Sequence, residues 1–203
     1  MDDKIHWYDG LFYDKLIAPN QDKLFKLIKN LIKPGTTVID IGCGTGRLPF
    51  YLSMHCSKVI GIDFSSKNIK LANLRKEKKQ IRNVEFFHGD ALKFQNPGNG
   101  KFDYAVITYV LHEMPPGERI KMLKKMKQLA NKIIIGDYVV PVPDSFYGKL
   151  TRIVEFLAGK DHNTNFKDYV KRGGLYFLLE QSELTIVKEI KRLPNMAHLV
   201  LAE

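Results

Sequence analysis

The sequence has little cysteine and no long apolar run, and both absences limit what the chain can be. Its 203 residues include only Cys43 and Cys56, so neither a disulfide framework nor a cluster of four zinc ligands can be assembled. No apolar stretch approaches the ~20 residues that span a bilayer, and MDDKIHWYD is charged where a signal peptide has an apolar core. We therefore expect a cytoplasmic protein with no transmembrane segment, and we predict no metal ligands.

A dinucleotide-binding motif is also absent, although a glycine-rich loop follows the first predicted strand. A GxGxxG pattern needs its third glycine five positions after the first, and in VIDIGCGTGR, residues 38–47, that position is Arg47. Glycines at the carboxyl end of a parallel strand nevertheless let backbone approach a ligand closely. The loop therefore predicts a small-molecule site, but not one for NAD.

Acidic residues are in the minority, and the formal net charge is +10. Basic surface attracts phosphates, so RNA is one candidate partner. The basic residues follow two predicted helices, however, which is equally typical of solvated helix faces. They are Lys67, Lys70, Arg75, Lys76, Lys78, Lys79 and Arg82 on one helix, and Lys121, Lys124, Lys125 and Lys127 on the other.

Strands and helices alternate along the first 140 residues, which predicts parallel strands, right-handed crossovers and helices on both faces of a sheet. The predicted strands are 37–41, 58–62, 84–87, 102–108 and 132–138. One predicted helix precedes the first strand and begins near residue 21, and the helices between later strands begin near residues 47, 66 and 116. Ser65 or Ser66 is expected to cap the basic helix. Three helices then follow, at 146–157, 166–172 and 175–180, and two strands, 184–190 and 196–201, close the chain around Pro194 and Asn195.

The glycine loop resembles the first motif of class I S-adenosylmethionine-dependent methyltransferases, DxGxGxG, in the residues Asp40, Gly42, Gly44 and Gly46. Acids also stand at the ends of the next two strands. Asp63 follows close to the offset of ~20 at which related folds hold a ribose diol, and Asp90 lies in HGDA. The resemblance implies S-adenosylmethionine as cofactor and S-adenosylhomocysteine as product. It also implies a doubly wound, mostly parallel seven-stranded α/β sheet with a C-terminal antiparallel hairpin.

The resemblance assigns the adenosine contacts residue by residue. It implies that Asp63 accepts from the ribose hydroxyls, that Phe64 packs on adenine, and that Asp90 and the amide of Ala91 bond the base. Thr108, at the end of the fourth strand, joins these contacts. Each acid alone could instead stabilise a turn, but three acids at successive strand ends together favour the cofactor.

Methyl transfer from a sulfonium is an in-line displacement, so positioning matters most, and a base is needed only when the acceptor must lose a proton. In this family the segment TYVLHEMP lies on the substrate side. It supplies Tyr109, His112 and Glu113, of which His112 is the favoured base because an unperturbed imidazole titrates near neutrality. His162 is a second candidate. The alternative is that His112 only shapes its loop.

The absence of one motif argues against one class of methyl acceptors. The segment lacks the Asn or Asp, two prolines and aromatic residue typical of methyltransferases that act on nucleobase amines or glutamine amides. Aromatic residues in 141–183 suit an apolar or aromatic small molecule or belong to a local core. HWYDGLFYD resembles the segment that folds over the cofactor in quinone-biosynthesis methyltransferases, so Tyr8 and Tyr13 either cover the sulfonium or simply pack.

We therefore predict one methyltransferase domain, residues 1–203, acting on a small-molecule acceptor. Its expected parts are an N-terminal helical lid (1–35), a cofactor-binding core (36–140), a helical substrate cover (141–183) and a closing hairpin (184–203). An RNA methyltransferase and a noncatalytic S-adenosylmethionine-binding protein remain alternatives. The sequence specifies neither the atom methylated nor the oligomeric state.

Overall fold

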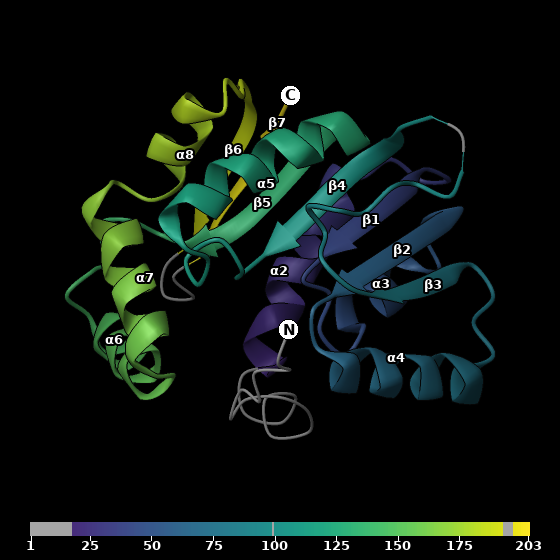
Figure 1. Ribbon diagram of the computed structural model, residues 1–203, viewed down its shortest axis with the longest axis horizontal. Coiled ribbons are helices and arrows are strands. Elements are labelled where there is room, and N and C mark those ends of the chain that lie inside the picture. The colour runs from purple at the N-terminus through teal and green to yellow at the C-terminus, as the bar shows by residue number, and fades with distance from the viewer. Residues whose placement is uncertain (1–17, 99, 193–196) are drawn as a thin grey trace. The chain divides into compact units, whose positions relative to one another are not determined.

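The computed structural model describes residues 18–98, 100–192 and 197–203 (Figure 1). Tyr8, Tyr13 and the turn at Pro194 and Asn195 lie outside the described residues. Contacts within the chain divide it into two compact units. Unit 1 comprises residues 1–106 with 129–131, and unit 2 comprises residues 107–128 with 132–203.

The described strands form one seven-stranded sheet in the order β3-β2-β1-β4-β5-β7-β6. β1 and β2 pair in parallel, as do β2 and β3, whereas β7 pairs antiparallel with both β5 and β6. The predicted mostly parallel sheet with a closing antiparallel hairpin is confirmed. The strands are β1 (Thr37–Ile41), β2 (Lys58–Asp63), β3 (Val84–His88), β4 (Phe102–Thr108), β5 (Ala130–Tyr138), β6 (Ile186–Arg192) and β7 (Ala197–Ala202).

Unit 1 contains helices α2 (Ala18–Leu31), α3 (Arg47–Leu52) and α4 (Ser66–Lys79). α4 contacts β2 and β3, and α3 contacts β2. Val38, Ile39 and Ile60 are fully buried, which explains why strands of this kind appear in the sequence as continuous apolar runs. Ser65 caps α4 as predicted, because its side chain accepts from the Asn68 amide at 3.2 Å.

Unit 2 holds most of α5 (Pro116–Leu129) and all of α6 (Phe146–Leu157), α7 (Lys160–Lys171) and α8 (Leu175–Gln181). The helix predicted for 166–172 begins too late, since α7 starts at Lys160 and includes most of the polar stretch GKDHNTN, residues 159–165. Asp161 in the first turn complements the helix dipole, and Phe166 and Tyr169 give the helix a buried face. α6 and α7 lie side by side, green in Figure 1. Within the described residues, no helix is long and apolar enough to cross a membrane.

A buried arginine ties the loop after β4 to α7. Arg119 on α5 is 1% exposed, and its Nε donates to the carbonyl oxygen of Met114 at 2.9 Å. Its Nη1 donates to Asp168 at 2.9 Å, and its Nη2 donates to the carbonyl oxygen of Asn165. The side-chain amide of Asn165 in turn donates to the Glu113 carbonyl oxygen at 2.7 Å. These bonds fix the position of residues 112–114 against α7.

Candidate functional site

The glycine loop between β1 and α3 uses backbone conformations that favour glycine. Gly42, Gly44 and Gly46 have φ angles of 71°, 53° and 83°. Among the described residues, a Cβ atom on Gly44 would meet nothing within 4 Å, whereas one on Gly46 would lie 2.5 Å from the Phe86 ring. The backbone at Gly44 therefore borders open space into which a ligand could fit, and Gly46 is required by packing.

Asp63 at the end of β2 holds the glycine loop in place. One carboxylate oxygen accepts from the Gly44 amide at 2.7 Å, and the other accepts from the Ser65 amide at 2.9 Å. The second of these oxygens also accepts from the side-chain amide of Asn68 at 3.4 Å. Asp63 therefore holds the glycine loop and the start of α4 at the position predicted for the ribose contact.

Asp40, on β1, is buried with an unsatisfied oxygen. The residue is 2% exposed, and among the described residues its Oδ1 has no hydrogen-bond partner. Burial, and then the charge of Asp63, raise the pKa of the Asp40 carboxyl well above its usual range. A buried carboxyl without a partner is costly unless a ligand supplies one. This oxygen therefore fits a site that receives a donor or a cation.

The raised pKa of Asp40 predicts an unusual pH dependence of stability. Its contribution is most favourable below the unfolded-state pKa and is lost as pH rises through the folded-state pKa. Asp40→Asn removes this ionisation. The quantity to compare is the free energy of unfolding of the variant minus that of the native chain. We expect this difference to be about 1–3 kcal/mol larger at pH 8 than at pH 4.5. Urea denaturation at both pH values measures this difference, and equal differences would contradict it.

The turn after β3 lies beside the end of β2. Asp63 pairs in register with His88, and the Gly89 amide donates to the Asp63 carbonyl oxygen at 3.0 Å. In this turn the Asp90 carboxylate accepts from the Leu92 amide at 2.9 Å. Phe64 is 60% exposed, so its ring is available to a ligand. The loops predicted to contact the cofactor therefore follow three adjacent strands, β1, β2 and β3. Ala91, in the loop after β3, is buried.

Comparison with known proteins agrees with this arrangement. Residues 38–132 match a family model described as a methyltransferase domain. A demethylmenaquinone methyltransferase of Bacillus cereus is 28% identical over 147 residues, covering 68% of this chain and 61% of that enzyme. Residues 38–132, slightly less than half of the chain, are thus similar to a methyltransferase domain. The corresponding enzyme of Listeria welshimeri is 28% identical over 163 residues, covering 76% of this chain and 67% of that enzyme. The aligned region thus spans less than two thirds of the Bacillus cereus enzyme.

Solved methyltransferase structures share the fold. A SAM-dependent methyltransferase from Aquifex aeolicus has a TM-score of 0.65 at 22% identity, covering 93% of this chain and 95% of its own. Magnesium protoporphyrin IX methyltransferase from Synechocystis, crystallised with SAH, has a TM-score of 0.64 at 20% identity, covering 100% of this chain and 89% of its own. The space that the described residues leave at Gly44 and the unsatisfied Asp40 oxygen fit a ligand bound at this loop.

In unit 2, β4 ends at Thr108, which is half-buried, and Tyr109 follows in a strained conformation. Tyr109 has a φ angle of 54°, which is uncommon for a residue with a side chain. Its amide donates to the Gly136 carbonyl oxygen at 2.8 Å, and its ring centre lies 5.2 Å from that of Tyr138. These contacts fix the start of the loop that carries His112.

His112 is surrounded by carboxylates. It is 2% exposed, with Nδ1 2.7 Å from Asp137 Oδ1 and Nε2 3.6 Å from Glu155 Oε1. Burial alone would lower its pKa, but Asp137, Glu155 and Glu113 together raise the pKa of His112 to about 9. The expectation of an imidazole that titrates near neutrality therefore does not match the structure. These carboxylates thus favour the protonated form of the imidazole.

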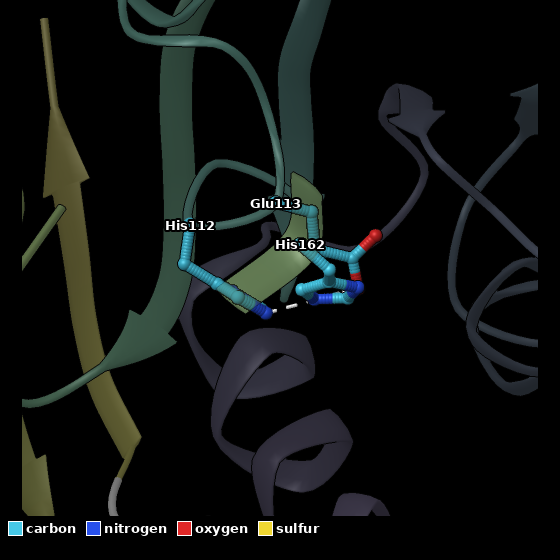
Figure 2. A group of neighbouring side chains, drawn as sticks. All are labelled: His112, Glu113 and His162. Carbon is cyan, nitrogen blue, oxygen red and sulfur yellow. Dashed lines mark ion pairs between the residues drawn. The ribbon is translucent and has the colours of Figure 1, made fainter. Parts of the chain in front are cut away.

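His162 belongs to the same cluster. From the first turn of α7, its Nε2 lies 2.8 Å from Glu155 Oε2 and 3.6 Å from Glu113 Oε1. Its ring centre is 5.7 Å from that of His112. Figure 2 shows His112, Glu113 and His162 pointing toward one another. The structure thus unites the two predicted histidines with Glu155 and Asp137, which the sequence analysis missed.

Proposed function

We propose that this chain transfers a methyl group from S-adenosylmethionine to a small-molecule acceptor. The observation that carries the proposal is the glycine loop, with open space at Gly44 and an unsatisfied oxygen on Asp40, beside Asp63 at the next strand end. When bound, S-adenosylmethionine supplies a methyl group already activated by its sulfonium. The chain's own task is then to hold the cofactor and orient the acceptor.

Five residues of unit 1 would divide the adenosine contacts among them. Asp63, at the end of β2, would accept from the ribose hydroxyls. The exposed ring of Phe64 would cover one face of adenine. The Asp90 carboxylate would accept from the adenine amine, and the Ala91 amide would donate to a ring nitrogen. The backbone at Gly44 would border the methionine part.

An apolar, quinone-like molecule is the acceptor that we propose. The relatives named above are demethylmenaquinone methyltransferases. In unit 2, a cavity of about 490 Å³ between α6 and α7 has largely apolar walls, which suits such a molecule. Its lining includes Val142, Phe156, Phe166 and Val170. Thr108 stays proposed on the cofactor side, and Tyr109, His112 and His162 stay proposed on the acceptor side. Two buried free cysteines are compatible with a proposed cytoplasmic location.

A labelled-methyl assay tests the proposal. The protein is incubated with methyl-labelled S-adenosylmethionine and a short-chain demethylmenaquinone, a cell metabolite extract or total RNA. We expect label in the quinone or another small molecule and none in RNA. Asp63→Ala should transfer far less. Binding of S-adenosylhomocysteine without transfer to any acceptor would instead indicate a noncatalytic binding protein. RNA labelling that falls steeply with salt would favour the nucleic-acid alternative, which no comparison supports.

A further inference from the structure

Two imidazoles and two carboxylates of unit 2 converge in a cluster whose composition the proposed methyl transfer does not require. Figure 2 shows three of these four side chains, those of His112, Glu113 and His162. His112 Nε2, His162 Nε2 and a carboxylate oxygen of Glu113 all lie within 4.8 Å of one another. Glu113 Oε1 is 3.7 Å from the first nitrogen and 3.6 Å from the second. Glu155, which is 3% exposed, reaches both histidines with its two oxygens, at 3.6 Å and 2.8 Å.

These separations suit a metal ion. Bonds of about 2.0–2.2 Å in a tetrahedral zinc site place ligand atoms about 3.3–3.6 Å apart. Three of the four nitrogen–oxygen separations lie within a few tenths of an ångström of this range. The fourth, 2.8 Å between His162 Nε2 and Glu155 Oε2, would have to lengthen when an ion binds. Two nitrogen and two oxygen ligands also favour a transition metal, because magnesium and calcium prefer oxygen ligands alone. We propose that His112, His162, Glu113 and Glu155 bind one divalent transition-metal ion of the zinc type.

The neighbours of His112 are arranged as those of a metal ligand usually are. Asp137, which is 1% exposed, lies 2.7 Å from His112 Nδ1 and accepts from the His112 amide at 3.2 Å. With the Nδ1 hydrogen bound to this carboxylate, the proton on Nε2 is the one that a metal ion would displace, which leaves the Nε2 lone pair directed at the cluster. The Tyr138 amide donates to the same carboxylate at 2.7 Å, so the carboxylate is itself held in place.

The backbone that carries the ligands is fixed as well. Glu113 is held through its carbonyl oxygen by the Asn165 amide, and Asn165 belongs to α7, the helix of His162. Arg119 bonds the carbonyl oxygens of Met114 and Asn165. The ligands from the loop and from α7 are therefore held at a defined separation before any ion arrives. This arrangement is contained in unit 2 and does not depend on the cofactor loop.

Zinc titration of the full chain, stripped with EDTA, tests the proposal. Competition with a chromophoric chelator should give one ion per chain and a dissociation constant below about 1 µM. Zinc should raise the melting temperature, and Co²⁺ should give the intense visible absorption of a low-symmetry site. His162→Gln should weaken zinc binding more than a hundredfold, and Asp137→Asn on the order of ten- to hundredfold.

The chain offers a matched control in the same unit. His198 is 2% exposed and lies 2.6 Å from the carboxylate of Glu189, but it is outside the cluster. His198→Gln should leave zinc affinity unchanged. If His162→Gln does not fold by circular dichroism, the half-exposed Glu113→Gln replaces it and should lose affinity to a similar extent. Micromolar or weaker zinc binding by the native chain, or equal affinities of the His162 and His198 variants, would show a metal-free ion-pair network. Because zinc binding is the readout, that result leaves S-adenosylhomocysteine binding untouched.

Discussion

Replacing Asp63 with alanine should weaken S-adenosylhomocysteine binding on the order of ten- to a hundredfold, which is about 1.5–3 kcal/mol for the loss of a charge-assisted contact. The carboxylate has two tasks: it accepts from the Gly44 and Ser65 amides, and it would accept from the ribose. Both losses act in the same direction. Calorimetry with S-adenosylhomocysteine measures the effect, and an unchanged affinity would contradict the ribose contact.

Asp103 provides the matched control for Asp63→Ala. Its carboxylate accepts from the amide and hydroxyl of Thr37, each at 2.8 Å, at the amino end of β1. It therefore fixes the same strand at the end away from the glycine loop. Asp103→Ala should lower the melting temperature about as much as Asp63→Ala and leave ligand affinity nearly unchanged. Equal losses of affinity in both variants would mean that loosening of unit 1, rather than a ligand contact, explains the Asp63 result.

Arg119→Met should lower the free energy of unfolding by about 3 kcal/mol, because it leaves buried backbone acceptors without a donor. The guanidinium is 1% exposed and bonds the carbonyl oxygens of Met114 and Asn165 as well as the Asp168 carboxylate. Methionine fills a similar volume but donates no hydrogen bond. Chemical denaturation of the full chain measures the loss.

A second arginine on the same carboxylate separates burial from charge. Arg172 donates to both oxygens of Asp168, at 2.9 and 3.0 Å, but its side chain is 48% exposed. Arg172→Met should therefore cost less than about 0.5–1 kcal/mol. Similar losses of unfolding free energy in the two variants would mean that Arg119 stabilises the fold through its ion pair with Asp168 and not through its bonds to buried carbonyl oxygens. Arg119→Lys should recover only part of the loss, because one ammonium cannot replace the guanidinium's planar set of donors.

The strands of unit 1 were predictable because their burial leaves a local mark. Residues 37–41 and 58–62 are apolar runs with a turn or an acid at the end, and Ser65 stands where a helix cap is needed. The start of α7 was not predictable in this way. Its first turn is polar because most of it faces solvent, and such a turn has the same composition as a loop.

The cluster in unit 2 was only half visible in the sequence. His112 and His162 were each candidates for a base, but they come from a loop and a helix that are distant in the chain. Glu155 occupies a polar position of an amphipathic helix, and only packing shows that this position is turned inward and 3% exposed. The pKa of His112 likewise depends on carboxylates from two other segments, β5 and α6, as well as on its neighbour Glu113. Charges brought together by tertiary structure leave no periodic signal.

Gly44 and Gly46 of the DxGxGxG motif are constrained by different features of the structure. This difference affects which substitutions homologues can accept at each position. Gly46 excludes larger residues because of the Phe86 ring on β3, a neighbour within the protein. Gly44 has no such neighbour. Homologues with smaller residues at the positions of both Phe86 and Phe50 have room for alanine at the position of Gly46, subject to its backbone strain. A substitution at the position of Gly46 would accompany a change in the residues that pack against it. A substitution at the position of Gly44 would instead indicate a change in the bound ligand.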